Sequence, residues 1–412
     1  MVRPVRFTRD GPLSRRMNPT SASPLFAVSS RPAPGGRAVA LSLVLLLSLP
    51  RLLRAENSLA YKYQDYQEAD DRVRVRNHNA RATVDLGTET SLRVRGVIDT
   101  ITGATPTGQP APDGSDQVPL SQLEDERRAV VVDLGRIFGT QTINLQYAFS
   151  TEDDYVSNGY AVTWLRDFNQ KNTQLQLGIA YNDDRIEPVF FDAARKKASR
   201  DFMVGVVQLL DRNTVLTANL SYGTSSGYLS DPYKIVQKSV EILPGFPLPL
   251  TFAENRPDSR EKTILFTQVA RHLEGMHASV EASVRFYTDS HGIDSDTLEF
   301  AWLQKLGEHV VVSPFVRYYR QGQADFYHVD LDATSIVPVP EPDGSAPYYS
   351  SDYRLSKFDA TTLGLKVTYR RDERWSADVA WERYEMRGRD GVTSASAYIT
   401  ADILTGGISL WF

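Results

Sequence analysis

Apolar and polar residues alternate along most of the chain from about residue 58 onward. In TINLQYAFS (142–150), Ile143, Leu145 and Tyr147 share one face of an extended chain, and Asn144 and Gln146 lie on the other. A period of two is the signature of a β-strand with one apolar face, and no helical period is sustained. The pattern therefore predicts an all-β protein, and it recurs in TQLQLGIAY (173–181), VLTANLSY (215–222) and LGLKVTYR (363–370).

The connections between the predicted strands alternate in length. Short turns on one side and long loops on the other are typical of bacterial outer-membrane barrels, which have an even number of strands. We therefore expect a transmembrane antiparallel up-and-down β-barrel of about sixteen strands, with fourteen as the alternative because some segments alternate poorly. The short turns are expected at 87–90, 138–141, 170–173, 211–214, 273–276, 306–309 and 371–374, the long loops at 102–125, 189–199, 229–258 and 325–355, and the poorly alternating segments are 58–68, 157–169 and 259–272.

A soluble β-sandwich or propeller in the periplasm would also show alternation. The polar face of these strands is, however, unusually charged, and aromatic residues such as Tyr147, Tyr181 and Tyr222 stand near strand ends on the apolar face. Aromatic girdles of this kind mark the membrane interfaces of outer-membrane barrels. The membrane barrel is therefore the favoured interpretation.

The first 55 residues differ from the rest of the chain. They contain nine arginines and one acid, and AVALSLVLLLSLP (38–50) is an apolar run of 13 residues. That length fits the core of a signal peptide and is short for a membrane-spanning helix. We expect 1–55 to be a leader cleaved near Ala55 and 56–412 to form a single barrel domain. The leader is unusually long, so Met17 is a candidate start site; a disordered leader before a membrane anchor is the alternative.

Composition narrows the classes of function. The chain has no cysteine, which excludes disulfides and thiolate chemistry. Its formal charge is −5, and loss of the leader would take it to about −13. Such an acidic chain argues against a nucleic-acid partner. No segment after the leader approaches 18 apolar residues, so a membrane-inserted chain must be a closed barrel.

The chain ends in GGISLWF, with apolar residues alternating up to the last position. A terminus in water usually frays and gains nothing from this pattern. We interpret Ile408, Leu410 and Phe412 as the lipid-facing residues of the final strand. A final strand with an aromatic last residue resembles the signal read by the outer-membrane assembly machinery.

Three further stretches are YKYQDYQEADDRVRV (61–75), GVIDTITGATPTGQP (96–110) and EDERRA (124–129). Together with the GGISLWF ending, they resemble a proteobacterial outer-membrane barrel family known as domain of unknown function 3570. The resemblance would cover nearly all of 56–412, and it implies an outer-membrane barrel without adding catalytic residues. Members tend to be encoded near redox-related and flavin-attachment proteins, which implies a weak link to an envelope electron-transfer system.

Charged residues on the polar face are the strongest candidates for function. By parity with their apolar neighbours they point into the lumen, which in a barrel this wide holds water or a plug. The cluster Arg81, Asp85, Arg93, Arg95 and Asp99 is favoured as solute-selective, because charges lining a pore select ions. The alternative is a salt-bridge network that braces the wall. The other charges expected in the lumen are Asp133, Glu281, Arg285, Glu299, Lys305, Arg317, Lys366, Arg370, Asp378 and Glu382.

Three loop segments are weaker candidates. GATPTGQPAPDGS (103–115) either folds inward as a constriction or lies on the surface. The prolines of LPGFPLPL (243–250) argue against regular strand pairing, and its apolar residues mark a binding surface or a loop packed over the barrel mouth. Asp289, Asp294 and Asp296 are a weak calcium candidate, because their spacing does not match an EF-hand loop; a solvated turn is favoured.

The sequence therefore favours an outer-membrane pore for small polar or charged solutes. The alternative is a structural barrel that holds an envelope protein partner, such as a redox protein. We do not expect an enzyme, because no G-x-S-x-G elbow accompanies the polar histidine of RNHN (76–79). The expected partners are outer-membrane lipid, the assembly machinery and the solutes, and no cofactor or metal is expected.

Overall fold

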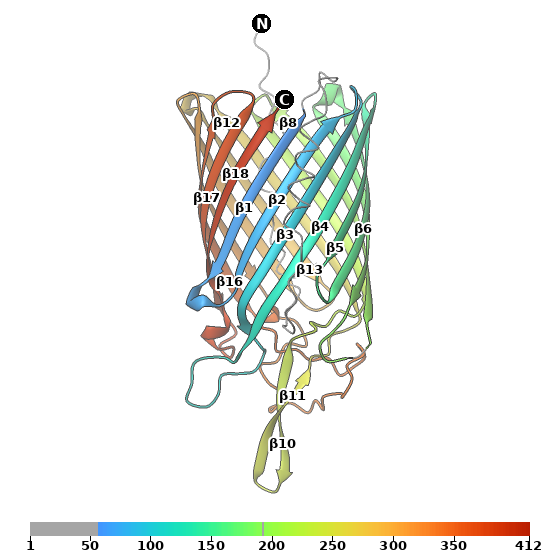
Figure 1. Cartoon of the computed structure of the whole chain (residues 1–412), viewed down its shortest axis with the longest axis vertical. Coiled ribbons are helices and arrows are strands. Elements are labelled where there is room, and N and C mark those ends of the chain that lie inside the picture. The colour runs from blue at the N-terminus through green and yellow to red at the C-terminus, as the bar shows by residue number, and fades with distance from the viewer. Residues whose placement is uncertain (1–56, 192) are drawn as a thin grey trace, which may run out of the picture.

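The chain forms one closed antiparallel barrel of sixteen strands, in the order β1 to β9 and then β12 to β18 (Figure 1). A computed structural model describes residues 57–191 and 193–412, so the expected leader, Met17 and the cleavage site at Ala55 lie outside the described residues. The last strand pairs with the first and closes the barrel, with Leu410 opposite Leu59. The expected all-β transmembrane barrel of sixteen strands is confirmed, and the alternative of fourteen is wrong.

The poorly alternating segments are strands like the others, because β1, β6 and β12 cover them. The barrel strands are β1 (Ser58–Glu68), β2 (Arg74–Asp85), β3 (Thr90–Pro106), β4 (Leu120–Phe138), β5 (Gln141–Thr151), β6 (Tyr155–Phe168), β7 (Thr173–Ile186), β8 (Arg195–Asp211), β9 (Thr214–Gly227), β12 (Ser259–Leu273), β13 (Ala278–Asp289), β14 (Asp294–Leu306), β15 (Val310–Gln321), β16 (Phe358–Arg370), β17 (Trp375–Gly388) and β18 (Thr400–Trp411). A separate hairpin consists of β10 (Ile235–Leu243) and β11 (Phe246–Ala253). The one-turn 3-10 helices are η2 (Ala69–Asp71), η3 (Asn169–Lys171), η4 (Glu274–Met276), η5 (Tyr353–Leu355) and η6 (Ala395–Ala397). Among the described residues, no helix is long and apolar enough to span a membrane.

The two ends of the barrel differ in their connections. All seven expected short turns lie at the end that carries the C-terminus, and the long loops with the β10–β11 hairpin lie at the other, together with three short connections at 69–73, 152–154 and 290–293 (Figure 1). Short turns are periplasmic and long loops extracellular in outer-membrane barrels. Two expected loops are shorter than predicted, because β3 and β4 remain paired as far as Pro106 and Leu120, and β8 begins at Arg195.

The wall has an apolar outer face and a polar inner face. Exposed apolar side chains occupy alternate positions, such as Leu298, Val379 and Leu404, with exposed fractions of 54%, 58% and 52%. These positions face lipid, as a strand with a period of two requires. On the inner face, Gly364 leaves room for the ring of Phe315, which lies where any side chain at residue 364 would be.

Candidate functional site: charged lumen and extracellular cap

All the charged residues expected in the lumen lie at inward-facing register positions. Residues opposite one another in adjacent strands share a face, so the register fixes the direction of each. Along the same strands the alternate residues, such as Val94 and Leu298, are the exposed apolar ones of the outer wall. Direct cross-strand neighbours are Arg81 and Arg95, Arg93 and Asp133, and Glu299 and Arg317.

Five charged residues of the lumen wall on β1 and β14 to β17 are ion-paired with one another; we call Lys62, Glu299, Arg317, Lys366 and Asp378 the paired sector. Arg317 Nε lies 2.7 Å from Glu299 Oε2. Asp378 Oδ2 forms ion pairs with two lysines, with Lys366 Nζ at 3.6 Å and Lys62 Nζ at 3.9 Å. This arrangement fits the bracing role that was the alternative for the lumen charges.

Three arginines on β2 and β3 behave differently; we call Arg81, Arg93 and Arg95 the arginine sector. None of their side chains makes an ion pair or hydrogen bond with any described residue, and the Nε atom of Arg93 is buried without an acceptor. Arg81 and Arg95 are direct neighbours across the two strands, where Cα atoms are separated by about 4.5–5.5 Å. The result is a concentrated positive charge on one part of the wall.

The acids of the expected cluster do not neutralise these arginines. Asp99 is 6% exposed and accepts a hydrogen bond from Arg127 Nε at 2.8 Å and another from the Asn77 amide. The Asp85 carboxylate has no partner among the described residues. Asp133, opposite Arg93, accepts a hydrogen bond from the side chain of Gln146. The cluster therefore separates into an unpaired arginine sector and a paired Asp99.

The extracellular mouth contains a second charged group, contributed by two loops far apart in sequence. Asp352 is 1% exposed and lies 2.8 Å from Arg256 Nη2 and 2.5 Å from Arg354 Nη2. Arg256 also donates to Glu254 Oε2 at 3.0 Å, and Arg354 pairs with Asp231. Burial disfavours the ionised carboxylate, but the two arginines outweigh it and hold the pKa of Asp352 below its usual range. We call these five residues the cap network.

The loops that carry the cap network pack onto the inner wall. Tyr353 and Tyr398 come from the loops and contact the inward-facing Phe358 and Met386 in a buried apolar cluster. Val118 joins the same cluster, so the loop after β3 contributes at its end. We use the name cap for this assembly, formed by 107–119, 228–258, 322–357 and 389–399.

The Pro- and Gly-rich loop 103–115 was expected either to fold inward or to lie on the surface, and the structure shows some of each. Residues 103–106 belong to β3, Gly108 lies against the backbone of Ile235 in the cap, and the tip at 112–117 is exposed. The loop is therefore partly a cap element and partly a surface loop.

The apolar segment 243–250 pairs as a strand, contrary to expectation. Pro247 and Pro249 lie in β11 opposite Glu241 and Ser239 of β10. A two-stranded hairpin consists of edge strands only, where proline is tolerated because its missing N–H faces outward. The hairpin projects away from the barrel (Figure 1), and Phe246 is 71% exposed, so its tip is not packed over the mouth.

The structure does not assemble the weak calcium candidate. Asp289 is held by Arg260 and by the hydroxyl of Tyr287, with Tyr287 Oη 2.6 Å from Asp289 Oδ2. Asp294 and Asp296 lie on the outward-facing, exposed positions of β14. His291, next to this turn, is buried, and burial lowers its pKa to about 4.

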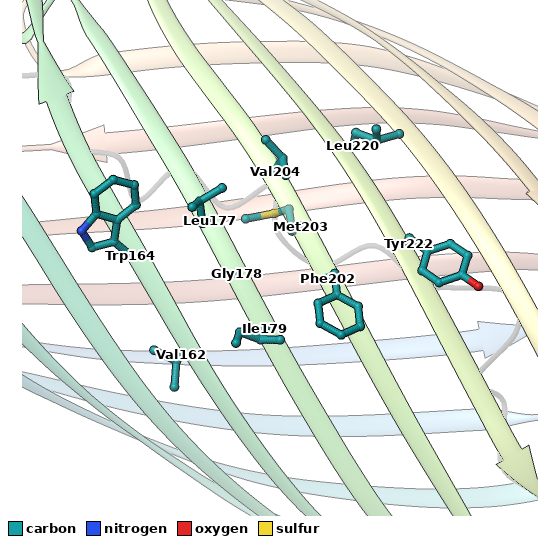
Figure 2. Close-up of a pocket in the computed structure, with 10 residues that line it drawn as sticks. All are labelled: Val162, Trp164, Leu177, Gly178, Ile179, Phe202, Met203, Val204, Leu220 and Tyr222. Carbon is teal, nitrogen blue, oxygen red and sulfur yellow. The ribbon is translucent and has the colours of Figure 1, made fainter.

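A shallow hollow of about 430 Å³ lies on the wall formed by β6 to β9 (Figure 2). Its apolar side chains, which include Val162, Leu177, Phe202 and Leu220, occupy outward-facing positions. The hollow therefore faces lipid, and it is not part of a route through the barrel.

Two groups of residues were not predicted from the sequence. The first is the cap network, whose members lie in expected loops and are joined only by tertiary contacts. The second is a trio of acids at the mouth, Asp125, Glu152 and Asp154, each of which has one side-chain oxygen within 4.8 Å of one oxygen of the other two. The short run EDD at 152–154 was a visible signal, but Asp125 fell within an expected loop.

Family comparison agrees with this architecture. The family model described as "Protein of unknown function (DUF3570)" matches residues 38–408. The chain belongs to this family. No curated protein matches it. The barrel architecture is that of bacterial outer-membrane proteins.

Similar solved structures include several outer-membrane barrels. The siderophore receptor PirA from Pseudomonas aeruginosa is 14% identical, with a TM-score of 0.44, over 87% of this chain and 62% of the receptor. A bacterial polysaccharide outer membrane secretin is 8% identical, with a TM-score of 0.49, over 88% of this chain and 100% of the secretin. CdiB from Acinetobacter baumannii is 10% identical, with a TM-score of 0.48, over 87% of this chain and 60% of CdiB. The chain thus spans less than two thirds of the receptor, and at these values the likeness says nothing about what it moves or binds.

Proposed function

We propose that the protein is an outer-membrane pore for small polar or charged solutes, that its arginine sector favours anions, and that the cap gates its extracellular end. The observation that carries the proposal is the unpaired state of Arg81, Arg93 and Arg95 on the lumen wall. Charges that hold a fold together are normally paired, whereas charges that select ions must remain free to meet the solute. A barrel of sixteen strands is wide enough to leave a water-filled channel.

The test is the reversal potential of the purified protein in a planar bilayer under a potassium chloride gradient. Wild type should prefer chloride, and the double variant Arg93→Gln/Arg95→Gln should shift the reversal potential towards cation selectivity. The shift should fade in 1 M salt, where charges are screened within about 3 Å.

The matched control removes two arginines from the outer wall. Arg136 and Arg166 stack over Phe138 and Phe168, at 5.3 Å and 5.0 Å from the ring centres, on outward-facing positions. Arg136→Gln/Arg166→Gln changes the net charge by the same amount and should leave selectivity unchanged. A shift of equal size in this control would contradict a role for the arginine sector.

The competing function is a structural barrel that holds an envelope partner. The observation that favours it is the paired sector, whose charges are ion-paired with one another within the wall. If neither wild type nor a variant with a disrupted cap conducts ions, although both are folded in the bilayer, the pore proposal fails and the scaffold takes its place.

A further inference from the structure

Three carboxylates converge at the extracellular rim, and none of them belongs to the arginine sector or to the cap network. Asp125 lies on the inward face of β4, in the part of the strand beyond its last paired position with β5, Arg128 opposite Thr151. Glu152 and Asp154 lie in the tight connection between β5 and β6, which is held by a backbone hydrogen bond from Glu152 N to Tyr155 O of 2.7 Å. One oxygen of each side chain lies within 4.8 Å of one oxygen of each of the others.

The carboxylate of Asp154 is unsatisfied. Both of its oxygens are buried and accept no hydrogen bond from another described residue, although other atoms of the residue are partly exposed. Asp125, its neighbour in the trio, is 8% exposed. A buried carboxylate without hydrogen bonds is costly and rare, and it indicates a missing cation or proton.

No basic side chain of the described residues forms an ion pair with any of the three carboxylates. Arg127 lies on the same face of β4, but it is ion-paired with Asp99. Lys197, on the next hairpin, is paired with Asp184, with Lys197 Nζ 3.2 Å from Asp184 Oδ2. Asp153, exposed in the same connection, adds further negative charge.

We propose that Asp125, Glu152 and Asp154 bind a calcium ion at the extracellular rim of the barrel. Calcium takes six to eight oxygen ligands at about 2.3–2.6 Å, so oxygens bound to one ion are at most about 5 Å apart. The observed convergence within 4.8 Å satisfies this limit without rearrangement. Backbone carbonyls and water commonly complete such sites. The ion would tie β4 to the β5–β6 connection, and the site does not depend on whether the barrel is an open pore.

The competing explanation is a proton in place of the ion. Burial, with the negative charge of Asp125 adding to it, raises the pKa of both Glu152 and Asp154 to about 7. Without an ion, the folded state would bind more protons than the unfolded chain between about pH 4 and pH 7, and stability would fall as the pH rises through that window.

Calorimetric titration of calcium into the EDTA-stripped barrel in detergent, free of lipopolysaccharide and at pH 8, distinguishes the two. Wild type should bind one calcium ion and melt at a higher temperature in its presence. Asp154→Asn should weaken binding at least tenfold. Asp125→Asn should do the same, so either variant can serve as the test if the other folds poorly. Asp153→Asn, which changes the charge of the same connection at an exposed position, should retain full affinity.

Terbium luminescence provides a second readout, because Tyr155 follows Asp154 and can sensitise a bound lanthanide. The emission should appear in wild type, fall on addition of calcium and be lost in Asp154→Asn. Two results would overturn the proposal: no calcium uptake by folded wild type at pH 8, or an equal loss of affinity in Asp153→Asn.

Discussion

The cap network and the arginine sector are two groups of charge inside one barrel, and they are built in opposite ways. The cap network combines both signs, is almost completely buried, and satisfies Asp352 with two arginines. The arginine sector has one sign only, and its three guanidinium groups have no acid as a partner among the described residues. A buried charge is tolerated only with a partner, whereas a charge that meets water in a lumen needs none. We therefore expect the cap network to contribute to folding stability, and under the proposed function the arginine sector is the group that meets the solute.

The largest expected effect is the loss of Arg354. Arg354→Ala would leave Asp352 with one arginine and Asp231 with none, and breaking such a buried pair costs about 3–5 kcal/mol. We expect the cap to open: the loop 322–357 should become sensitive to protease, and bilayer conductance should rise.

Arg387→Ala is the control for this variant. Arg387 pairs with Glu385 near the same mouth, but the two side chains are 81% and 40% exposed. Such a surface pair is worth about 0–1 kcal/mol, so protease resistance should be retained. If Arg354→Ala were equally resistant, the cap network would not hold the loops.

The paired sector should show an effect of intermediate size. Arg317→Gln removes the ion-pair partner of Glu299, while Glu382, on β17 two strands away from Arg317, has no ion-pair partner among the described residues. The side chains of Arg317 and Glu299 are 26% and 18% exposed, between the buried and the surface cases, so we expect a loss of about 2 kcal/mol in the free energy of unfolding. Urea unfolding in detergent measures it. A loss below that of Arg387→Ala would show that these pairs do not brace the wall.

The sequence predicts which residues of the wall face the lumen, but it predicts few of the ion pairs between them. Parity is a local property, so the inward direction of Arg93 or Glu299 follows from neighbouring residues alone. Pairing depends on register and on strand length. Because 102–125 was expected to be a loop, the first part of β4, residues 120–125, was missed, and with it the position of Asp125 at the mouth.

The cap network could not be predicted from any local sequence pattern. Asp231 and Arg354 are 123 positions apart, and the residues around them show no periodicity that would bring them together. The hairpin β10–β11 was missed for a different reason, because prolines exclude a strand from a sheet interior but not from an isolated hairpin. The assembly role of Ile408, Leu410 and Phe412 stays a prediction: the structure shows that β18 pairs with β1, and it does not test recognition.

The smallest expected effect on stability belongs to the arginine sector itself. Arg93→Gln/Arg95→Gln removes two positive charges that form no ion pair with a described residue, so no ion pair is lost; the weakened attraction between Arg93 and the opposite Asp133 is offset by the relieved repulsion between Arg95 and Arg81. The free energy of unfolding should change by less than about 0.5 kcal/mol. If the same variant shifts the reversal potential, these arginines affect ion selectivity without contributing to stability. A bracing role does not allow that result. A stability loss comparable to that of Arg317→Gln, with an unchanged reversal potential, would place these arginines with the paired sector and favour the scaffold.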